Sequence, residues 1–273
     1  MTGRSRAVEV SRFRAELREP CTDQVAAEEP LEIRLGYVID GERRTDSVSI
    51  TMRTPGDDED LATGFLFSEG VLQSADDLMV VKPCEGENTI RVELEDHVNV
   101  DLGGLQRHFY TTSSCGVCGK ASLDALYAQG CTVLANGFSM SAAALTALPD
   151  ELRKAQATFE ETGGLHAAAA FDTSGELIIV REDVGRHNAV DKVVGALLRD
   201  ARLPASQYGL IVSGRASFEL TQKALVAGMP LLAAVSAPSS LAVELAQEFN
   251  VTLVGFLRGD TFNVYAGGER ITR

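Results

Sequence analysis

The amino-acid sequence predicts an α/β protein whose main domain follows a smaller α+β region. In the second half, three short apolar runs at 209–212, 231–235 and 251–257 alternate with helix-like segments. Apolar strands separated by helices are typical of a parallel sheet that is covered on both faces. A chain of 273 residues can form one large domain or two modest ones, and can bury a core without disulfides.

The other elements of the second half follow from local signals. Residues 168–180 are strand-like around Ser174-Gly175, which predicts a hairpin. Helices are expected near 188–198 and over 218–227. Ser239 or Ser240 can cap a further helix that ends at Phe249.

The first third has a different pattern. Residues 1–28 are polar and charged without periodicity, so we expect a flexible arm. Strand-like segments at 31–39 and 48–53 flank Asp40-Gly41, a hairpin signal, and 89–95 alternates apolar with polar residues. A helix is expected over 57–69, which has three acids in its first turn and Gly70 after it.

These patterns predict three parts: a flexible arm at 1–28, a small α+β region at 29–108 and an α/β domain at 109–273. The last boundary is placed where Gly103-Gly104 and the Thr/Ser run at 111–114 interrupt the pattern.

Composition argues against several classes of protein. The formal net charge is −14 and the pI is about 4.8, whereas nucleic-acid binders need a basic face for phosphate contacts. The chain lacks an apolar run of 18 residues, and its basic N-terminus has no apolar region after it. We therefore expect a cytoplasmic protein that binds neither nucleic acid nor membrane.

Two of the five cysteines form a CxxC pair. An odd number of cysteines in a cytoplasmic chain argues against a disulfide framework. Cys115 and Cys118 lie among glycines and small polar residues, a composition typical of an exposed loop. A helix is expected from about Ala121, and its N-terminus together with Lys120 would lower the pKa of a nearby thiol.

A lone CxxC is compatible with three kinds of site. It can be half of a structural zinc site, a dithiol redox pair or a sulfur carrier, because a nucleophilic thiolate can hold a persulfide and release it. A closed zinc site needs four ligands, and no second CxxC or histidine pair is present. We therefore expect no structural metal, while the spacing leaves the other two kinds of site open.

A second segment, 181–192, places seven charged or titratable side chains around Gly185 between a predicted strand and a predicted helix. Ligands bind at such strand-to-helix loops in open α/β sheets. The alternative is a solvated loop of ion pairs. Arg186-His187-Asn188 at the start of the helix favours a ligand site.

Two further loops follow predicted strands. Ser213, Gly214 and Arg215 form a turn before a helix whose first amides could hold a phosphate, although such turns often only cap a helix. Residues 256–261 follow the last apolar strand, where Arg258 and Asp260 would suit a nucleotide. The alternative there is a β-turn between two strands.

His166 stands alone before four alanines. A histidine in this setting is more often a packed or capping residue. In a pocket it could act as an acid, a base or a partner for a thiolate.

Taken together, these segments resemble the FdhD family of formate dehydrogenase accessory sulfurtransferases. The matching stretches are TPGDDEDLATGFLFSEG at 54–70, SSCGVCGK at 113–120, TGGLHAAA at 162–169, REDVGRHNAVDKVVG at 181–195, SGRASFEL at 213–220 and GFLRGDTFNVY at 255–265. They occur in the order that the family has. The likeness is far more specific than a bare CxxC.

The resemblance implies a main domain similar to the cytidine deaminase α/β fold, and a homodimer. It also implies that a cysteine desulfurase donates persulfide sulfur, which passes to molybdenum in bis(molybdopterin guanine dinucleotide) before this cofactor enters formate dehydrogenase. Cys115 matches the family's persulfide cysteine. The family's cofactor-binding stretch matches Phe256, Leu257, Arg258, Gly259, Asp260 and Thr261.

Deamination itself is not expected. Zinc deaminases need His-x-Glu, and here His166 is followed by Ala167-Ala168. From side-chain type, we expect Cys118 to resolve the persulfide, and Arg215, His187 and Arg258 to orient phosphate and guanine. The alternatives are a non-catalytic chaperone for the molybdenum cofactor and a dithiol oxidoreductase.

Overall fold

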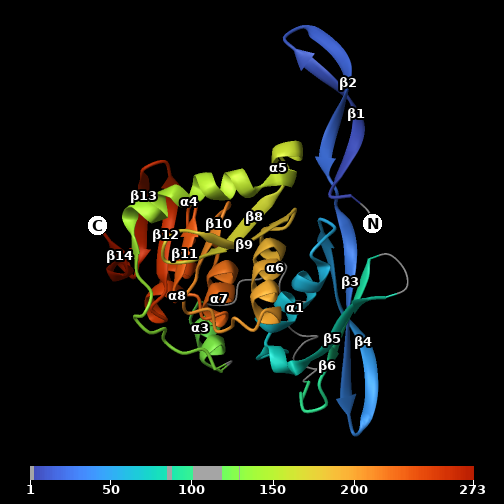
Figure 1. Cartoon of the computed structure of the whole chain (residues 1–273), viewed down its shortest axis with the longest axis vertical. Helices are drawn as coiled ribbons and strands as arrows, with labels where there is room; N and C mark the ends of the chain where they lie inside the picture. Colours follow the sequence, from blue (N-terminus) through green and yellow to red (C-terminus); the bar gives the residue numbers. More distant parts are fainter. Residues whose placement is uncertain (1–2, 85–87, 101–118, 129) are drawn as a thin grey trace.

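The computed structural model describes residues 3–84, 88–100, 119–128 and 130–273. A six-stranded sheet in the order β13-β12-β11-β10-β8-β9 forms the centre of the main body (Figure 1). In chain order its strands are β8 (His166–Phe171), β9 (Leu177–Asp183), β10 (Gly209–Val212), β11 (Leu231–Ala234), β12 (Thr252–Arg258) and β13 (Thr261–Ala266). The three strands predicted from apolar runs and the predicted hairpin are confirmed.

The sheet is mixed rather than parallel throughout. Strands β10, β11 and β12 are parallel, while β8, β9 and β13 pair antiparallel to their neighbours. The expectation of a parallel sheet therefore holds only for the three middle strands. The reason is that β8–β9 and β12–β13 are hairpins, and a short turn can only connect antiparallel strands.

Helices cover both faces of this sheet, as predicted. Alternate side chains of β10 separate into two cores: Leu210 and Val212 pack on one face, and Ile211 packs on the other. Helices α6 (Arg186–Arg199), α7 (Phe218–Val226) and α8 (Ser240–Glu248) contribute to the first core, and α4 (Ala142–Ala155) contributes to the second.

The N-terminal part has its own four-stranded sheet, in the order β4-β3-β6-β5. Its elements are β3 (Glu29–Ile39), β4 (Glu42–Arg53), α1 (Asp58–Ser68), a 3-10 turn η1 (Ala75–Asp77), β5 (Leu78–Pro83) and β6 (Thr89–Leu94). The predicted strands and helix are confirmed. Asp40 and Gly41 both have positive φ, 53° and 78°, as the predicted tight hairpin turn requires.

Helices α1 and α6 join the two parts by crossing at glycines. A Cβ atom on Gly64 would lie 1.8 Å from the carbonyl oxygen of Asp191, and one on Gly195 would lie 1.9 Å from that of Asp60. Only glycine allows the two backbones to approach so closely. The close crossing of the two helices therefore explains why residues 64 and 195 are glycines.

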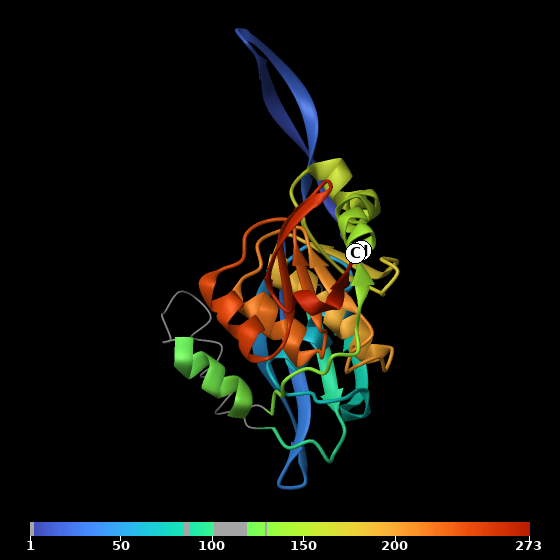
Figure 2. The same cartoon turned by 90° about the vertical axis from the view of Figure 1, so that its left-hand side faces the viewer.

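The segment expected to be a flexible arm is a regular hairpin, so the expectation of irregular structure there is wrong. Strands β1 (Ser5–Arg14) and β2 (Leu17–Ala26) pair along their whole length. The hairpin rises from the body beside α5 (Ala157–Thr162), as Figures 1 and 2 show. Most of its side chains are exposed on both faces, so the segment lacks the alternation that reveals a strand.

The remaining described elements are α3 (Gly119–Ala128), β7 (Met140–Ser141), η2 (Gly268–Arg270) and β14 (Ile271–Thr272). The predicted boundary near residue 108 lies outside the described residues. Across the described ranges, no helix is both long and apolar enough to cross a membrane.

Candidate functional site

The loops that follow β10 and β11 and the last residues of β12 lie side by side at the carboxyl edge of the main sheet. Their backbones continue the pairing of the strands: Ser236 N–H donates to the Gly214 carbonyl (3.2 Å), and Phe256 N–H donates to the Ser236 carbonyl (3.1 Å). Ligands bind at this edge in open α/β sheets. The structure therefore brings the predicted loops at 213–215 and 256–261 together.

His166 reaches the same edge because β8 runs antiparallel to β10. Ser213 is bound to the start of β8 twice: its amide donates to the Ala167 carbonyl (3.0 Å), and its hydroxyl accepts from the Ala167 amide (2.9 Å). A Cβ atom on Gly214 would lie 3.5 Å from His166 Nδ1. The glycine thus leaves the imidazole room beside the loop.

Several polar groups gather near this imidazole. Burial lowers the pKa of His166, and the nearby charges of Arg186 and His187 lower it further. His187 Nε2 lies 2.6 Å from the Glu219 carboxylate, a contact that lowers the pKa of Glu219. The His166 imidazole therefore binds a proton less readily than a free histidine does.

Arg186 Nε and Ser217 Oγ are buried at this edge, and neither has a hydrogen-bond partner among the residues that the structure describes. Arg186 is the first residue of α6, and Ser217 immediately precedes α7. Helix N-termini present free backbone N–H groups and favour anions. The arrangement is chemically suited to the phosphates of a nucleotide.

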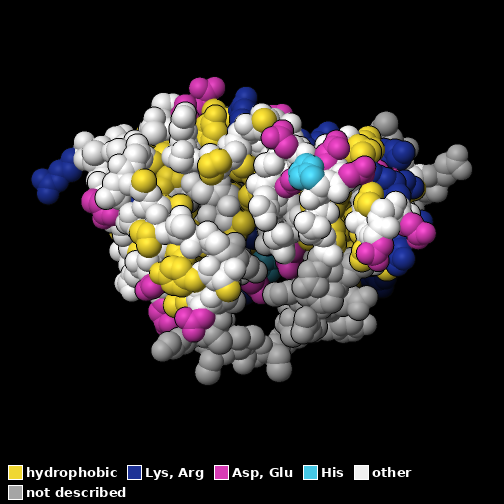
Figure 3. All heavy atoms as spheres, turned by 90° about the horizontal axis from the view of Figure 1, so that it is seen from below, with side chains coloured by type: hydrophobic (Ala, Val, Ile, Leu, Met, Phe, Trp, Pro, Cys, Tyr) yellow, Lys and Arg dark blue, Asp and Glu magenta, His cyan; other side chains and the backbone are white. Residues whose placement is uncertain are grey.

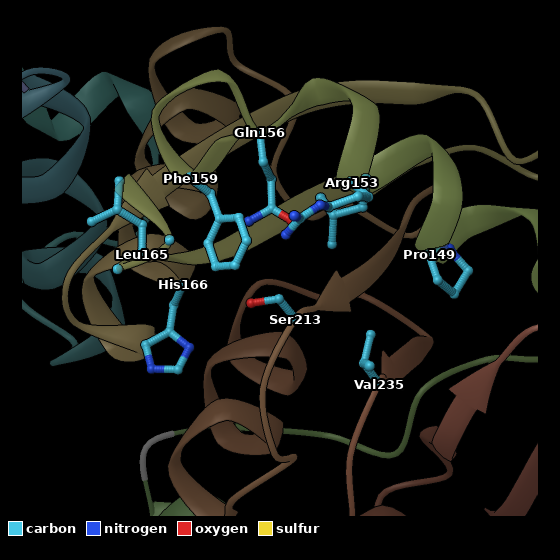
Figure 4. A pocket seen from close by; sticks show the side chains of 11 residues that line it. Pro149, Arg153, Gln156, Phe159, Leu165, His166, Ser213 and Val235 are labelled. Carbon is cyan, nitrogen blue, oxygen red and sulfur yellow. The ribbon is translucent and has the colours of Figure 1, made fainter. Parts of the chain in front are cut away.

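A cavity of about 550 Å³ opens beside His166 and Ser213, between α4, α5 and the carboxyl edge (Figure 4). Leu152, Arg153, Gln156 and Phe159 line it from the helices, and His166, Ser213 and Val235 line it from the sheet. The helical residues were not among the candidates that the sequence predicted. Their signal is the spacing of Leu145, Leu148 and Leu152 after the cap Ser141, which is typical of an amphipathic helix.

Residues 256–261 form the end of the β12–β13 hairpin, so the β-turn alternative describes their local structure. Arg258 pairs with Thr261 across a two-residue turn, and Gly259 and Asp260 are exposed at its tip. Arg258 Nε donates to the Val235 carbonyl (2.9 Å), which holds the guanidinium over a residue that lines the cavity. Leu257 is buried in the core, so its side chain cannot contact a ligand.

The charged segment 181–192 is mostly structural. Lys192 Nζ lies 2.7 Å from Asp183 Oδ2, and both side chains are almost fully buried. Asp183 also accepts hydrogen bonds from the amide of Thr54 and the side chain of Asn188. Of Arg186-His187-Asn188, only the first two therefore remain candidates for a ligand.

Two other charged side chains of this segment, Asp191 and Arg181, also contact partners within the protein. Asp191 accepts from Ser68 Oγ (2.9 Å) and lies 2.7 Å from Lys223 Nζ. Arg181 lies 2.7 Å from Asp60 of α1. These contacts fasten the N-terminal part to the main body.

Cys115 and Cys118 lie outside the described residues. The predicted helix after them is confirmed: α3 begins at Gly119, immediately after Cys118. Its last turn is held to the end of α8, where Tyr127 donates to the Glu248 carboxylate (2.7 Å). Burial raises the pKa of Cys131, which makes this described thiol a poorer nucleophile. Among the described residues, no group of three or more His, Cys, Asp or Glu side chains could hold a metal ion.

Comparison with protein-family models identifies the family. Residues 26–272 match the FdhD/NarQ family. The chain therefore belongs to the FdhD/NarQ family, as the motifs indicate.

Named relatives and a solved structure agree with this assignment. A protein of Streptomyces coelicolor named sulfur carrier protein FdhD is 54% identical, covering 91% of this chain and 89% of the relative. One of Sulfurisphaera tokodaii with the same name is 44% identical, covering 97% and 98%. A crystal structure from Desulfotalea psychrophila, described as that of a formate dehydrogenase accessory protein, superimposes with a TM-score of 0.79. That protein is 25% identical, and the match covers 98% of this chain and all of the other.

Proposed function

We propose that this chain is a sulfur carrier for formate dehydrogenase. It accepts persulfide sulfur from a cysteine desulfurase on Cys115 and passes it to bis(molybdopterin guanine dinucleotide) molybdenum before the cofactor enters the dehydrogenase. The observation that carries the proposal is the dithiol directly before α3, in a chain whose relatives are named sulfur carrier.

The position of the dithiol favours nucleophilic chemistry. In the sequence the dithiol directly precedes α3 and Lys120, and a helix N-terminus and a lysine both stabilise a thiolate that lies close to them. In the first step, the Cys115 thiolate attacks the terminal sulfur of the desulfurase persulfide. The S–S bond of the donor breaks, Cys115 becomes a persulfide, and the desulfurase cysteine leaves as a thiolate.

Release of the sulfur needs two electrons, and Cys118 can supply them. Its thiolate attacks the inner sulfur of the Cys115 persulfide, which forms a Cys115–Cys118 disulfide and expels hydrosulfide. Hydrosulfide is the form that molybdenum can take as a ligand. A dithiol reductant then reopens the disulfide for the next cycle.

The proposed acceptor binds along the carboxyl edge of the main sheet. Arg258, Arg215 and His187 orient its phosphates and guanine, close to the unpaired Arg186 Nε and Ser217 Oγ. The likeness of the main domain to the cytidine deaminase fold, the cytoplasmic location and the homodimer belong to the same proposal.

Formate dehydrogenase activity distinguishes a carrier from a chaperone that only binds and inserts the cofactor. We expect Cys115→Ala to abolish the activity of cells that depend on this chain, and Cys118→Ala to reduce it because hydrosulfide is not released. Cys84→Ala is the matched control, because it removes a free thiol outside the CxxC pair, and it should retain activity. Full activity with Cys115→Ala would favour the chaperone. Reduction of generic disulfides by the purified protein would favour a dithiol oxidoreductase.

Binding of guanine nucleotides tests the acceptor site. We expect GDP to bind more tightly than ADP, because the Asp260 carboxylate can accept from two guanine N–H groups. Arg258→Ala or Asp260→Asn should weaken GDP about ten- to a hundredfold, the usual effect of losing a charged hydrogen bond. Calorimetric titration measures this. Equal affinity for GDP and ADP would refute specific recognition of guanine. Unchanged GDP affinity in both variants would indicate that GDP binds elsewhere, near Ser213–Arg215.

A further inference from the structure

The cavity between α4, α5 and the sheet contains a buried polar group that none of the described residues pairs with. Gln156 is only 5% exposed, yet its side-chain Nε2 has no hydrogen-bond partner within the described part of the chain. A buried amide without a partner costs about 1–3 kcal/mol, and folded proteins generally avoid it. Figure 4 shows the amide directed into the cavity, above Ser213.

The backbone fixes Gln156 in this position. It ends α4, where its amide donates to the Arg153 carbonyl (3.3 Å), and it precedes α5, where its carbonyl accepts from the Glu160 amide (2.9 Å). The buried carboxylate of Glu182 is already used at this junction, because it accepts from the amides of Thr158 (3.0 Å) and Phe159 (2.8 Å). The Glu182 carboxylate therefore accepts hydrogen bonds from the first turn of α5 and not from the Gln156 side chain.

The other walls suit a flat ring that carries a phosphate. Phe159 presents an aromatic ring, and the Arg153 guanidinium lies 4.1 Å from the centre of that ring, at the solvent side. Leu152 and Val235 add apolar surface. None of the described lining residues is acidic, although the chain has a net charge of −14. The described lining thus contains no acidic side chain, and the Arg153 guanidinium at its edge lies 3.6 Å from the Glu160 carboxylate, a pair that a bound phosphate would share.

The rim of the cavity beside Gly163 is open space. Gly163 has a positive φ of 67°, and a Cβ atom there would meet nothing within 4 Å. The size of the cavity, about 550 Å³, is in the range of small-molecule sites.

We propose that Gln156, Phe159 and Arg153 form a subsite for a 2-amino-4-oxopyrimidine ring, the ring that guanine and pterins share. The Gln156 amide donates to the ring carbonyl and accepts from the adjacent ring N–H. Phe159 packs on the face of the ring, and Arg153 binds a neighbouring phosphate. This assignment rests on the proposed function. It adds a buried pocket that recognises the ring to the exposed turn at Asp260, which is proposed to contact guanine.

Calorimetric titration of the full chain with GDP and with pterin, in wild type and in Gln156→Leu, tests the subsite. Leucine has a similar size and removes an unpaired buried amide, so the variant should unfold at the wild-type temperature or higher. We expect it to bind GDP, pterin or both at least tenfold more weakly, and the ligand affected identifies which end of the cofactor the pocket holds. Gln247→Leu, an exposed position on α8, is the matched control and should bind as the wild type does.

The outcomes separate this inference from the carrier function. Unchanged affinity of Gln156→Leu for both ligands would overturn the subsite, as would a wild type that binds neither ligand yet carries persulfide on Cys115. Binding that depends on Gln156 in a chain that never acquires persulfide would instead support the subsite and refute the carrier.

Discussion

At the scale of single residues, the sequence identified the charged positions but not their roles. Asp183 and Lys192 form a buried ion pair, whereas His187, a few residues away, faces the carboxyl edge. The pattern of charges is the same for both roles. What separates them is a partner such as Thr54, more than a hundred residues earlier, which only the fold brings near.

The pocket residues show the same limit. Gln156 and Arg153 are ordinary polar residues at the end of an amphipathic helix, and no local pattern distinguishes them from solvated side chains. Their role depends on the cavity that α4, α5 and the sheet form together. His166, by contrast, was noted from the sequence as an acid, a base or a thiolate partner if it lies in a pocket, although a packed or capping role is commoner for such a histidine.

The protonation of His166 gives a testable prediction about pH. Burial, with Arg186 and His187 nearby, lowers its pKa below the ordinary 6.5, while Asp183 opposes this more weakly. The unfolded chain therefore binds the proton more readily, so stability is complete above pH 6.5 and falls as the pH decreases toward the folded pKa.

Urea unfolding at about pH 7.5 and about pH 5.5 measures this effect, and His166→Gln removes the titrating group. We expect the wild type to lose more stability than the variant between the two pH values. An equal loss in both proteins, or an NMR titration midpoint for His166 above 6.5, would contradict the prediction.

At the scale of elements, periodicity located most helices and strands but not how they cross. The helix at 58–68 was predicted from its acidic first turn and from the glycine after it. Gly64 inside this helix disfavours helix formation by about 1 kcal/mol relative to alanine. The structure explains why residue 64 is nevertheless a glycine, because the backbones of α1 and α6 touch at this position.

The β1–β2 hairpin and helix α4 were missed for two different reasons. The β1–β2 hairpin lacks alternation because neither of its faces packs on a core. Helix α4 has a buried stripe, but Pro149 stands in its middle, and an internal proline usually ends a helix.

Substitution of Gly64 tests the helix crossing. Gly64→Ala places a methyl group 1.8 Å from a backbone oxygen that cannot rotate away, so the helices must separate. We expect a loss of about 1–3 kcal/mol in the free energy of unfolding, as for other overpacked sites. Gly137→Ala is the matched control, because its new methyl group would meet nothing within 4 Å. Equal stability of the two variants in urea would show that the crossing is looser than the structure indicates.

At the scale of the whole molecule, two sheets are joined through α1 and α6, and the hairpin extends away from them (Figures 1 and 2). The end opposite the hairpin carries acidic and apolar side chains intermixed (Figure 3). Several Lys and Arg side chains gather along one side of the same view (Figure 3). The α/β class and the order of the elements followed from the sequence, because apolar runs and caps are local signals.

The central claim is that sulfur travels on Cys115, and peptide mass spectrometry after incubation with a cysteine desulfurase and cysteine tests it most directly. Our account predicts one added sulfur atom on the peptide that contains Cys115, lost on treatment with a thiol reductant and absent from Cys115→Ala. Cys131, whose pKa burial raises, should remain unmodified. Sulfur found only on Cys21, Cys84 or Cys131, or a chain that acquires none while it still supports formate dehydrogenase, would contradict the account.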